Sequence, residues 1–564
     1  MEPRLMPPVS RRHLLKLGST VAAVSALGLR HGESLADGDP PPANVKQPDR
    51  GGAFRIRIAQ SPAHFDPHQT AAYSTMVPLS FAYSRLVMIK PGSSIVPGTQ
   101  PLDTDLAQSW DRIGDSVYIF RLRPGVRWQP KPPVNGRELT ADDVKYTFER
   151  FLATKGNPNR AVLEMVDRVE APDKYTVKFT LKEPNAWFVD RLAATSTWIV
   201  ARECVEKYGD LKKWESVVGT GPWMLDRYEP GTRLTFVRNP NCFYPNLPYV
   251  DSVELSIIPD PNAALNAFLA GKLDFGPEYG MTLRRGDVAV AKKRLGHWWL
   301  PLQTREFLVP SGRITAMKLD QDPVKDVRIR RAIAMADNWR DLLERNPLAQ
   351  GKGAPSPLVP AALKEWSVPI KELPPEGQKL YESPDPAGAR QLLAAAGFPG
   401  GVKIPVETTA GYGPEWMDAV QVTLKNWKAA GIEADLKVQD YETFVSSSAS
   451  GKFDKVMLAV REGATDPDSY LEALLPGDSL NVSGVNDSKL TEMIKRQRRT
   501  FKDSARRDIV YDIQRYCAQQ VYYACGPSPS VVAAWLPYVI DFGPNIGPDY
   551  GGRLMSAWLD KSTR

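Results

Sequence analysis

The fold is decided by the stretch Phe120-Arg121-Leu122-Arg123-Pro124-Gly125-Val126-Arg127-Trp128. Residues 116–122 predict a β-strand, the Pro-Gly pair predicts a turn, and residues 126–128 predict a second, short strand. A helix is predicted to open at Thr140, because its hydroxyl can cap the first turn and the acidic residues that follow favour the positive end of the helix dipole. We therefore expect a hairpin and a helix that form one layer and bury Tyr118, Phe120, Trp128 and Phe148.

Outward from this stretch, strand and helix patterns alternate along the chain. After residue 310 the predicted helices become longer, and glycines close several of them. This alternation predicts an α/β protein, and the change in helix length predicts two halves. The predicted strands are 54–58, 175–181, 234–237, 250–258, 432–438, 454–460 and 530–536, and the further predicted helices are 74–86, 261–270, 327–343, 386–396, 416–430 and about 487–524 with a break.

The composition indicates a large globular protein. With 564 residues, 42% of them hydrophobic, the chain can bury a large core and is long enough for more than one lobe. The formal net charge is +7, but residues 1–36 hold five basic and two acidic residues, which leaves +4 for the remainder. Because the basic residues are interleaved with acidic ones, we expect no binding to nucleic acid.

An export signal is predicted at the N terminus, where Ser10-Arg11-Arg12-His13-Leu14-Leu15-Lys16 places an arginine pair ahead of an apolar run. The twin-arginine translocase reads this pattern. The run, residues 14–29, is shorter than the roughly 20 apolar residues of a membrane span. Ser34-Leu35-Ala36 suits a signal peptidase, so we predict a signal peptide over 1–36, a disordered leader over 37–53 and a periplasmic protein without a lipid anchor. The alternative is a chance arginine pair in a basic tail.

The chain offers few ligands for a metal or a redox cofactor. It has five histidines and four cysteines, without a Cys-x-x-Cys spacing. A Walker loop, a Gly-x-Ser-x-Gly elbow and a dinucleotide fingerprint are also absent from the sequence. His64 and His68 have the spacing of helical zinc ligands, but Pro67 between them interrupts a helix. We therefore predict no metal, no cofactor and no catalytic residue.

Several further segments, taken together in order and spacing, carry a resemblance. They are Phe65-Asp66-Pro67-His68, Leu106-Ala107-Gln108-Ser109-Trp110, Gly219-Thr220-Gly221-Pro222-Trp223, Arg238-Asn239-Pro240, Val327-Arg328-Ile329-Arg330-Arg331-Ala332-Ile333, Leu392-Leu393-Ala394-Ala395-Ala396-Gly397-Phe398 and Ala430-Gly431-Ile432. With the opening stretch and Leu139-Thr140-Ala141-Asp142-Asp143-Val144, the chain resembles the extracytoplasmic solute-binding proteins of ABC importers, family 5. The Gly219-to-Pro222 segment predicts a turn, in which the glycines can adopt positive φ and the proline fixes its own φ.

The resemblance implies an α/β periplasmic-binding-protein fold of two lobes that hinge around a ligand in a cleft. Lobe I is expected over 54–310, with an extra subdomain near 87–200, and lobe II over 311–525. Residues 526–564 are expected to return to lobe I. The resemblance also implies a monomer that captures a small-molecule or oligomeric solute and delivers it to an ABC permease.

Candidate ligand contacts come from positions that match the family's cleft segments. In Gln69-Thr70-Ala71-Ala72-Tyr73 the candidates are Thr70 and Tyr73, with helix packing as the alternative for Tyr73. In Tyr412-Gly413-Pro414-Glu415-Trp416 they are Tyr412 and Trp416, with burial in the core as the alternative for Trp416. The segment 460–468 matches the family's cleft loop and offers Arg461, Gly463, Thr465 and Asp466.

The same loop argues against an ordinary peptide ligand. Peptide binders of this family typically present Trp-x-x-Asp there, with the carboxylate paired to the α-ammonium of the peptide. An alignment without gaps places Val460 at the tryptophan and Gly463 at the aspartate, so both anchors are missing. Arg461 would also repel an ammonium. We expect a sugar, an opine-like conjugate or another solute without a free α-amino group.

Two other functions and one structural question stay open. A solute receptor for a sensor, or a chaperone, would use the same fold. The export route is also used by folded redox enzymes, although the sequence offers no cofactor ligands. Four cysteines in an oxidising compartment allow disulfides, and Cys204–Cys242 with Cys517–Cys525 are the pairings that stay within one lobe.

Overall fold

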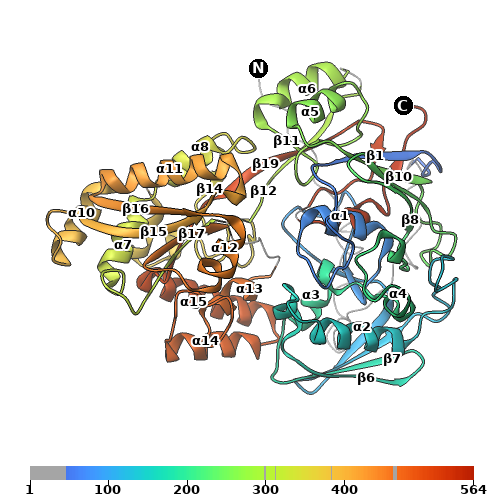
Figure 1. The fold of residues 1–564 in the computed structure, drawn as a ribbon, viewed down its shortest axis with the longest axis horizontal. Helices are drawn as coiled ribbons and strands as arrows, with labels where there is room; N and C mark the ends of the chain where they lie inside the picture. Colours follow the sequence, from blue (N-terminus) through green and yellow to red (C-terminus); the bar gives the residue numbers. More distant parts are fainter. Residues whose placement is uncertain are drawn as a thin grey trace, which may run out of the picture.

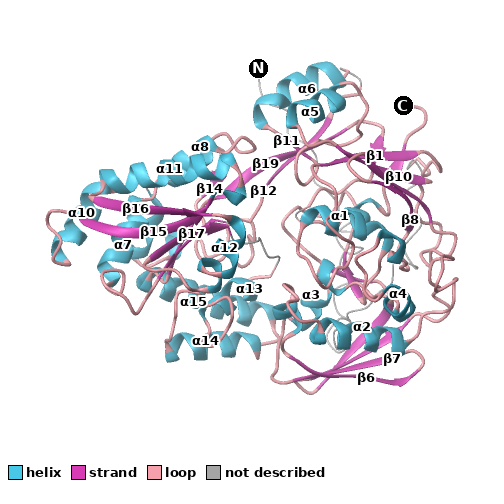
Figure 2. Ribbon diagram, in the orientation of Figure 1, coloured by secondary structure: helices cyan, strands magenta, loops and turns pink. Residues whose placement is uncertain are grey.

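The computed structural model describes residues 46–297, 300–310, 313–382, 384–460, 466–545 and 547–563. Figure 1 shows two halves: lobe I, which contains β1 to β12, and lobe II, which contains β13 and β15 to β18. Each half combines helices with strands (Figure 2), so the predicted two-lobed α/β fold is confirmed. The predicted signal peptide, residues 1–36, lies outside the described residues.

The main sheet of lobe I has the strand order β1-β10-β9-β8. β1 is parallel to β10, and the other pairs are antiparallel. Alternate residues of β1 are buried, which is the period of two that predicted this strand. The elements are β1 (Ala53–Ile58), α1 (Tyr73–Ala82), β8 (Trp223–Glu229), β9 (Arg233–Arg238), β10 (Ser252–Ile257), α5 (Pro261–Leu269), β11 (Thr282–Leu283), α6 (Val288–Leu295) and β12 (Gln303–Leu308).

A second sheet of lobe I has the order β4-β5-β7-β6 and packs against helix α2 (Ala141–Ala153). Thr140 and Asp143 form a capping box at the start of α2, where the Asp143 carboxylate accepts from the Thr140 backbone N–H at 2.9 Å. The other elements are β2 (Val87–Ile89), β3 (Leu102–Thr104), β4 (Ala107–Ile113), β5 (Val117–Leu122), β6 (Val166–Asp173), β7 (Thr176–Leu181), α3 (Phe188–Leu192) and α4 (Arg202–Tyr208).

The hairpin predicted over 120–128 is not formed. β5 pairs with β4 on one side and with β7 on the other, so neither of its edges is left for residues 126–128. The Trp128 backbone N–H instead donates to the Arg137 carbonyl oxygen at 2.9 Å. The four aromatic side chains that we expected to be buried in this layer do share one core: Tyr118, Phe120, Trp128 and Phe148.

The sheet of lobe II has the order β16-β15-β17-β13-β18, and β15 is parallel to both β16 and β17. The helix predicted over 327–343 is divided in two, because the Asn338 side chain caps a new helix by accepting from the Arg340 backbone N–H at 3.2 Å. The elements are β13 (Arg313–Met317), α7 (Val327–Ala336), α8 (Trp339–Arg345), α9 (Pro375–Glu382), α10 (Pro386–Ala395), β15 (Val402–Thr409), α11 (Pro414–Ala429), β16 (Ile432–Gln439), α12 (Tyr441–Ser446), β17 (Val456–Val460), α13 (Asp468–Leu471), α14 (Ser488–Arg498), α15 (Asp503–Gln520) and β18 (Tyr523–Cys525).

The chain crosses between the lobes twice, along neighbouring segments. β12 leads into β13, and β18 leads back into β19 (Ser528–Trp535). β12 pairs with β19 in lobe I, and β13 pairs with β18 in lobe II. The lobe boundaries near 310 and 525 stay a prediction. The remaining elements are β14 (Gly353–Ala354), which pairs with β19, and β20 (Val539–Ile540), α16 (Tyr550–Leu554) and β21 (Trp558–Leu559).

Residues 46–53, predicted as part of the disordered leader, instead contact lobe I. The Gly51 backbone N–H donates to the Tyr249 carbonyl oxygen at 2.9 Å. Lys46 forms an ion pair with Asp560 near the other end of the chain. The prediction failed for these residues because local composition does not reveal partners supplied from so far along the sequence.

The expected disulfides are also wrong: none of the four cysteines, all of which are described, forms one. Cys204 and Cys517 are buried in two different apolar clusters. Burial raises the pKa of the Cys204 thiol to about 12 and that of Cys242 to about 11. Such thiols carry little thiolate and behave as small apolar side chains.

The turn Gly219-Thr220-Gly221-Pro222 lies directly against the C-terminal end of α1. A Cβ atom at Gly219 would lie 2.1 Å from the Ala82 carbonyl oxygen, and one at Gly221 would lie 2.6 Å from the Ala82 carbonyl carbon. Neither glycine has a positive φ. Glycine is therefore required here by close approach of two backbone segments, and not by a left-handed conformation.

Gly219→Ala should destabilise the protein by about 3 kcal/mol, because the added methyl group overlaps a carbonyl that cannot move without displacing α1. Gly400→Ala is the matched control, since an added Cβ there meets no atom within 4 Å. Urea denaturation followed by circular dichroism measures both. Equal unfolding midpoints for the two variants would contradict the packing described for this turn.

Candidate ligand-binding site

Three strands of lobe II end at one edge of its sheet. β15 ends at Thr409, β16 at Gln439 and β17 at Val460, and β15 is parallel to the other two. Loops at the carboxyl ends of parallel strands are the usual ligand-binding positions of α/β proteins. Helices α12 and α13, which follow β16 and β17, lie on the side of lobe II that faces lobe I (Figure 1). This edge is therefore the candidate binding edge of lobe II.

Tyr412 is at the centre of an aromatic cluster on this edge. Its ring packs edge-on against Trp416 at 5.4 Å, Tyr441 at 5.8 Å and Phe444 at 6.0 Å between ring centroids. Burial raises the pKa of the Tyr412 hydroxyl to about 12. Trp416 is only 9% exposed, and its indole N–H donates to the Thr408 hydroxyl at 3.1 Å. Of the two candidates in this segment, Trp416 belongs to the core and Tyr412 lies between the core and the surface.

Two apolar side chains at the same edge, Tyr441 and Val460, are exposed. Tyr441 is 51% exposed and Val460 is 41% exposed. Neighbouring exposed apolar groups on a globular protein commonly mark a binding surface. Tyr441 was not a candidate from the sequence. Its position directly after the carboxyl end of a predicted strand is the signal that could have identified it.

On lobe I, Tyr73 lies in a second aromatic cluster. Its hydroxyl donates to the Gly547 carbonyl oxygen at 2.8 Å, and its ring lies 3.6 Å from that of Tyr279 between centroids. Tyr279 is 59% exposed, so it extends this cluster to the surface. The other candidate, Thr70, accepts from the Ala72 backbone N–H at 2.9 Å and so stabilises the loop. Sequence reasoning missed Tyr279 because it is far from Tyr73 along the chain.

A buried ion pair holds the Asp-Pro-His turn that precedes Tyr73. Arg150 of α2 donates to both carboxylate oxygens of Asp66, at 3.1 and 2.5 Å. Burial disfavours the charged carboxylate, but hydrogen bonding from Arg150 outweighs this effect and lowers the pKa of Asp66. Burial lowers the pKa of His68 to about 3, so its ring is neutral. The motif therefore positions the Thr70–Tyr73 segment as a scaffold.

These histidines have partners other than a metal. His64 Nδ1 accepts from the Asp66 backbone N–H at 3.2 Å, and His68 Nδ1 lies 2.7 Å from Arg150 Nη1. Within the described ranges, no three His, Cys, Asp or Glu side chains are grouped to hold a metal ion. No helix of the described part is both long and apolar enough to cross a membrane.

An ion pair between the lobes connects the two aromatic clusters. Arg284 of lobe I contacts Glu278 at 2.9 Å and reaches Glu415, at the start of α11, at 3.8 Å. Glu278 is the chain neighbour of Tyr279, and Glu415 lies in the segment of Tyr412. The two carboxylates that Arg284 contacts are thus close in sequence to the two aromatic clusters.

The remaining candidates belong to the loop between β17 and α13. Asp466 is buried and caps α13, because its carboxylate accepts from the Ser469 backbone N–H at 2.9 Å and from the Ser469 hydroxyl at 2.6 Å. Its carboxylate is thus used within lobe II. Arg461, Gly463 and Thr465 lie outside the described residues.

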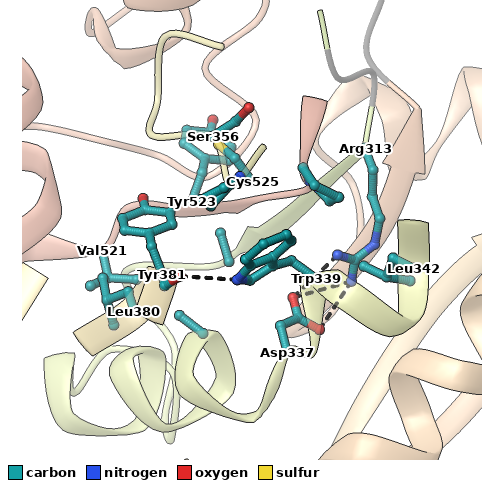
Figure 3. A pocket seen from close by; sticks show the side chains of 14 residues that line it. Arg313, Asp337, Trp339, Leu342, Ser356, Leu380, Tyr381, Val521, Tyr523 and Cys525 are labelled. Atoms are coloured by element: carbon teal, nitrogen blue, oxygen red, sulfur yellow. Dashed lines mark hydrogen bonds and ion pairs between the residues drawn. The ribbon is translucent and has the colours of Figure 1, made fainter. Parts of the chain in front are cut away.

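A separate pocket lies in lobe II beside the crossing segments (Figure 3). Trp339 lies between Tyr381 and an ion pair of Arg313 with Asp337, and its indole N–H donates to the Tyr381 carbonyl oxygen at 2.9 Å. The 3.2 Å contact with Asp337 compensates the charge of Arg313. All lining residues but Pro527 belong to lobe II, so this pocket lies beside the crossing segments and not between the aromatic clusters of the two lobes.

Residues 102–481 match the family model described as bacterial extracellular solute-binding proteins, family 5 middle. The chain belongs to this family. Di/tripeptide-binding protein 3 of Pseudomonas aeruginosa is 28% identical over 497 residues, which cover 82% of this chain and 86% of that protein. Heme-binding protein A of Haemophilus influenzae is 24% identical over 491 residues, which cover 79% of this chain and 84% of that protein.

Solved structures show the same fold. The periplasmic binding protein DppA of Helicobacter pylori, in complex with the peptide STSA, matches with a TM-score of 0.73 and 21% identity over 91% of this chain and 99% of that chain. AgaA from A. tumefaciens R10, in complex with agropinic acid, matches with a TM-score of 0.72 and 20% identity over 90% of this chain and 99% of that chain. At 20–21% sequence identity, the similarity to these structures shows a shared fold and nothing about the ligand.

The different burial of two aromatic neighbours gives a direct test of this site. Trp416→Ala should lower the free energy of unfolding by about 3–5 kcal/mol, because it empties a buried position. Tyr441→Ala, the matched control from the exposed side of the same cluster, should cost less than about 1 kcal/mol. Guanidinium denaturation monitored by far-UV circular dichroism compares them. A mild effect of Trp416→Ala would show that this ring is not a core group.

Proposed function

We propose that this protein is the periplasmic receptor of an ABC importer, which captures a solute between its lobes and delivers it to a membrane permease. The observation that carries this proposal is an exposed aromatic side chain on each lobe, Tyr279 on lobe I and Tyr441 on lobe II, together with the Arg284–Glu415 ion pair that links the two lobes. Ligand sites commonly form between lobes in this way. Membership of the solute-binding family supports the proposal.

In this proposal the protein performs binding and closure without chemistry. Residues 54–310 and 526–564 form lobe I, and residues 311–525 form lobe II. A solute that contacts both lobes stabilises the closed form, and the permease recognises that form. The protein acts as a monomer and needs no cofactor. Tyr73 packs against Tyr279, and Tyr412 packs against Tyr441.

The same observations give less support to two other roles. A receptor for a sensor, or a chaperone, would use the same surfaces, and a permease gene beside this one would favour transport. A redox enzyme exported by the twin-arginine route would need a cofactor site, and no three His, Cys, Asp or Glu side chains of the described part are grouped to hold a redox metal.

The solute that we propose lacks a free α-amino group. Val460 and Gly463 occupy the positions at which peptide binders of the family typically present tryptophan and aspartate, and no carboxylate at 463 can pair with an ammonium. The only carboxylate of the loop that the structure describes, Asp466, is used to cap α13. The AgaA complex shows that this fold also holds a ligand such as agropinic acid. We therefore favour a sugar or an opine-like conjugate.

Calorimetric titration with a mixture of di- and tripeptides should show no micromolar binding to the native protein. Gly463→Asp should improve affinity for peptides with a free amine, because it restores a carboxylate for the ammonium. Gly400→Asp adds the same charge at an open surface position and should change nothing. Micromolar binding to the native protein that vanishes when the peptides are N-acetylated would overturn this ligand class.

Export should depend on the arginine pair, because the translocase reads the planar guanidinium groups and lysine does not reproduce their geometry. The double substitution Arg11→Lys/Arg12→Lys should leave uncleaved precursor in the cytoplasm. Arg4→Lys, in the same N-terminal segment, is the control. Immunoblots of cytoplasmic and periplasmic fractions give the result. Normal periplasmic accumulation of the double variant would contradict the twin-arginine route.

A further inference from the structure

A second contact between the lobes lies far from the crossing segments. In Figure 1, β12 and β19 are in the upper part of the molecule, whereas α3 of lobe I meets α13 and α14 of lobe II in the lower part. The guanidinium of Arg191, on α3, lies 2.9 Å from an Asp468 carboxylate oxygen and 2.7 Å from a Glu472 carboxylate oxygen. The Arg191 side chain is only 3% exposed. It is thus a lobe I charge that is enclosed by lobe II.

Neighbouring groups extend this contact into a network. Arg498 of α14 also binds Asp468, at 2.9 Å, so one buried carboxylate is shared by arginines of both lobes. The Ala186 backbone N–H donates to the Arg498 carbonyl oxygen at 2.8 Å. The Trp187 indole N–H donates to the Gln497 side chain, also at 2.8 Å. All these groups belong to the protein itself, so the contact needs no solute to form.

Separation of the lobes would disturb this network strongly. Asp468 and Glu472 would lose Arg191 and keep Arg498 as their cation. Separation would also break the Ala186 and Trp187 hydrogen bonds to α14, while water would solvate the charges that are parted. The network therefore favours the arrangement in which α3 touches α13 and α14.

We propose that Arg191 is an interlobe latch, which holds the lobes together without bound solute and loosens as the pH rises. A protein whose binding-competent form is already populated binds its ligand more tightly, since the free energy needed for closure is smaller. The latch therefore sets how readily the solute-free protein closes. This inference concerns the solute-free protein and does not depend on which solute is bound.

The pH dependence follows from an excess of carboxyl groups at the contact. Burial raises the pKa of Glu472 to about 7, and burial together with the nearby Asp466 raises the pKa of Asp190 to about 7. In separated, hydrated lobes both carboxyls would titrate near 4, so closure takes up protons at intermediate pH. The titratable and charged groups that face these two carboxyls are Tyr118 of β5, Arg191 of α3, Asp466, Asp468 of α13, Arg498 of α14, and Asp503 and Arg506 of α15.

The direction in which pH changes the closure equilibrium follows from this proton uptake. A group whose pKa is raised in the closed form favours closure below that pKa and opposes it above. Between pH 6 and pH 8 each of the two carboxyls should reduce the closure equilibrium constant about tenfold. The solute-free protein should therefore be compact at pH 6 and more open at pH 8.

Small-angle scattering of protein freed of solute by unfolding and refolding tests the latch. The native protein should expand between pH 6 and pH 8, from a radius of gyration of roughly 24 Å, by on the order of 1 Å. Arg191→Met should be expanded at both pH values. Arg121→Met is the matched control, because Arg121 pairs with Asp111 within lobe I and is exposed.

A more conservative variant tests the latch if Arg191→Met does not fold. Asp190→Asn/Glu472→Gln preserves the shapes of both side chains and should remain compact at pH 6 and at pH 8. The latch is refuted if the native protein has one radius of gyration across this range and Arg191→Met shares it. It is also refuted if the native protein and the double variant expand equally between pH 6 and pH 8.

Discussion

The paired crossing of the chain between the lobes is the constraint on which the rest of the structure depends. β12 with β19, and β13 with β18, are antiparallel pairs on either side of the crossing. Between them Pro310 and Pro527 have no backbone N–H to donate, so few hydrogen bonds must change when the lobes rotate. Each lobe has its own apolar core, so a rotation at the crossing leaves both cores intact. The interlobe contacts of Arg284 and Arg191 then decide which rotation is favoured.

Much of the fold could be predicted from local sequence, because periodicity and capping are local effects. The alternation that predicted residues 54–58 as a strand and the cap at Thr140 are both present. The hairpin over 120–128 failed because the partners of a strand depend on which other strands occupy its edges, and β4 and β7 occupy both. The disulfide prediction failed for a similar reason, because two cysteines of the same lobe need not lie close together in space. Gly219 was recognised as necessary, but only the nearby Ala82 carbonyl explains why.

The candidate site was less accessible to sequence reasoning. The segment of Tyr412 was found because it matches a cleft segment of the family, whereas the strand that precedes it, β15, was not predicted. Tyr279 was missed because it meets Tyr73 only through the fold. Trp416 and Tyr441 are both aromatic, and sequence alone cannot assign one to the core and the other to the surface, since burial depends on what the rest of the chain places around each ring. The same holds for Arg191, whose acidic partners lie far along the chain.

The most direct test of solute capture between the lobes is a crystal structure of protein purified without denaturation, so that a tightly held solute is retained. We expect electron density for one small molecule without an α-ammonium group, in contact with Tyr279 on lobe I and with the Tyr412–Tyr441 edge of lobe II. A solute bound wholly within lobe II, for example in the pocket around Trp339, would contradict the account.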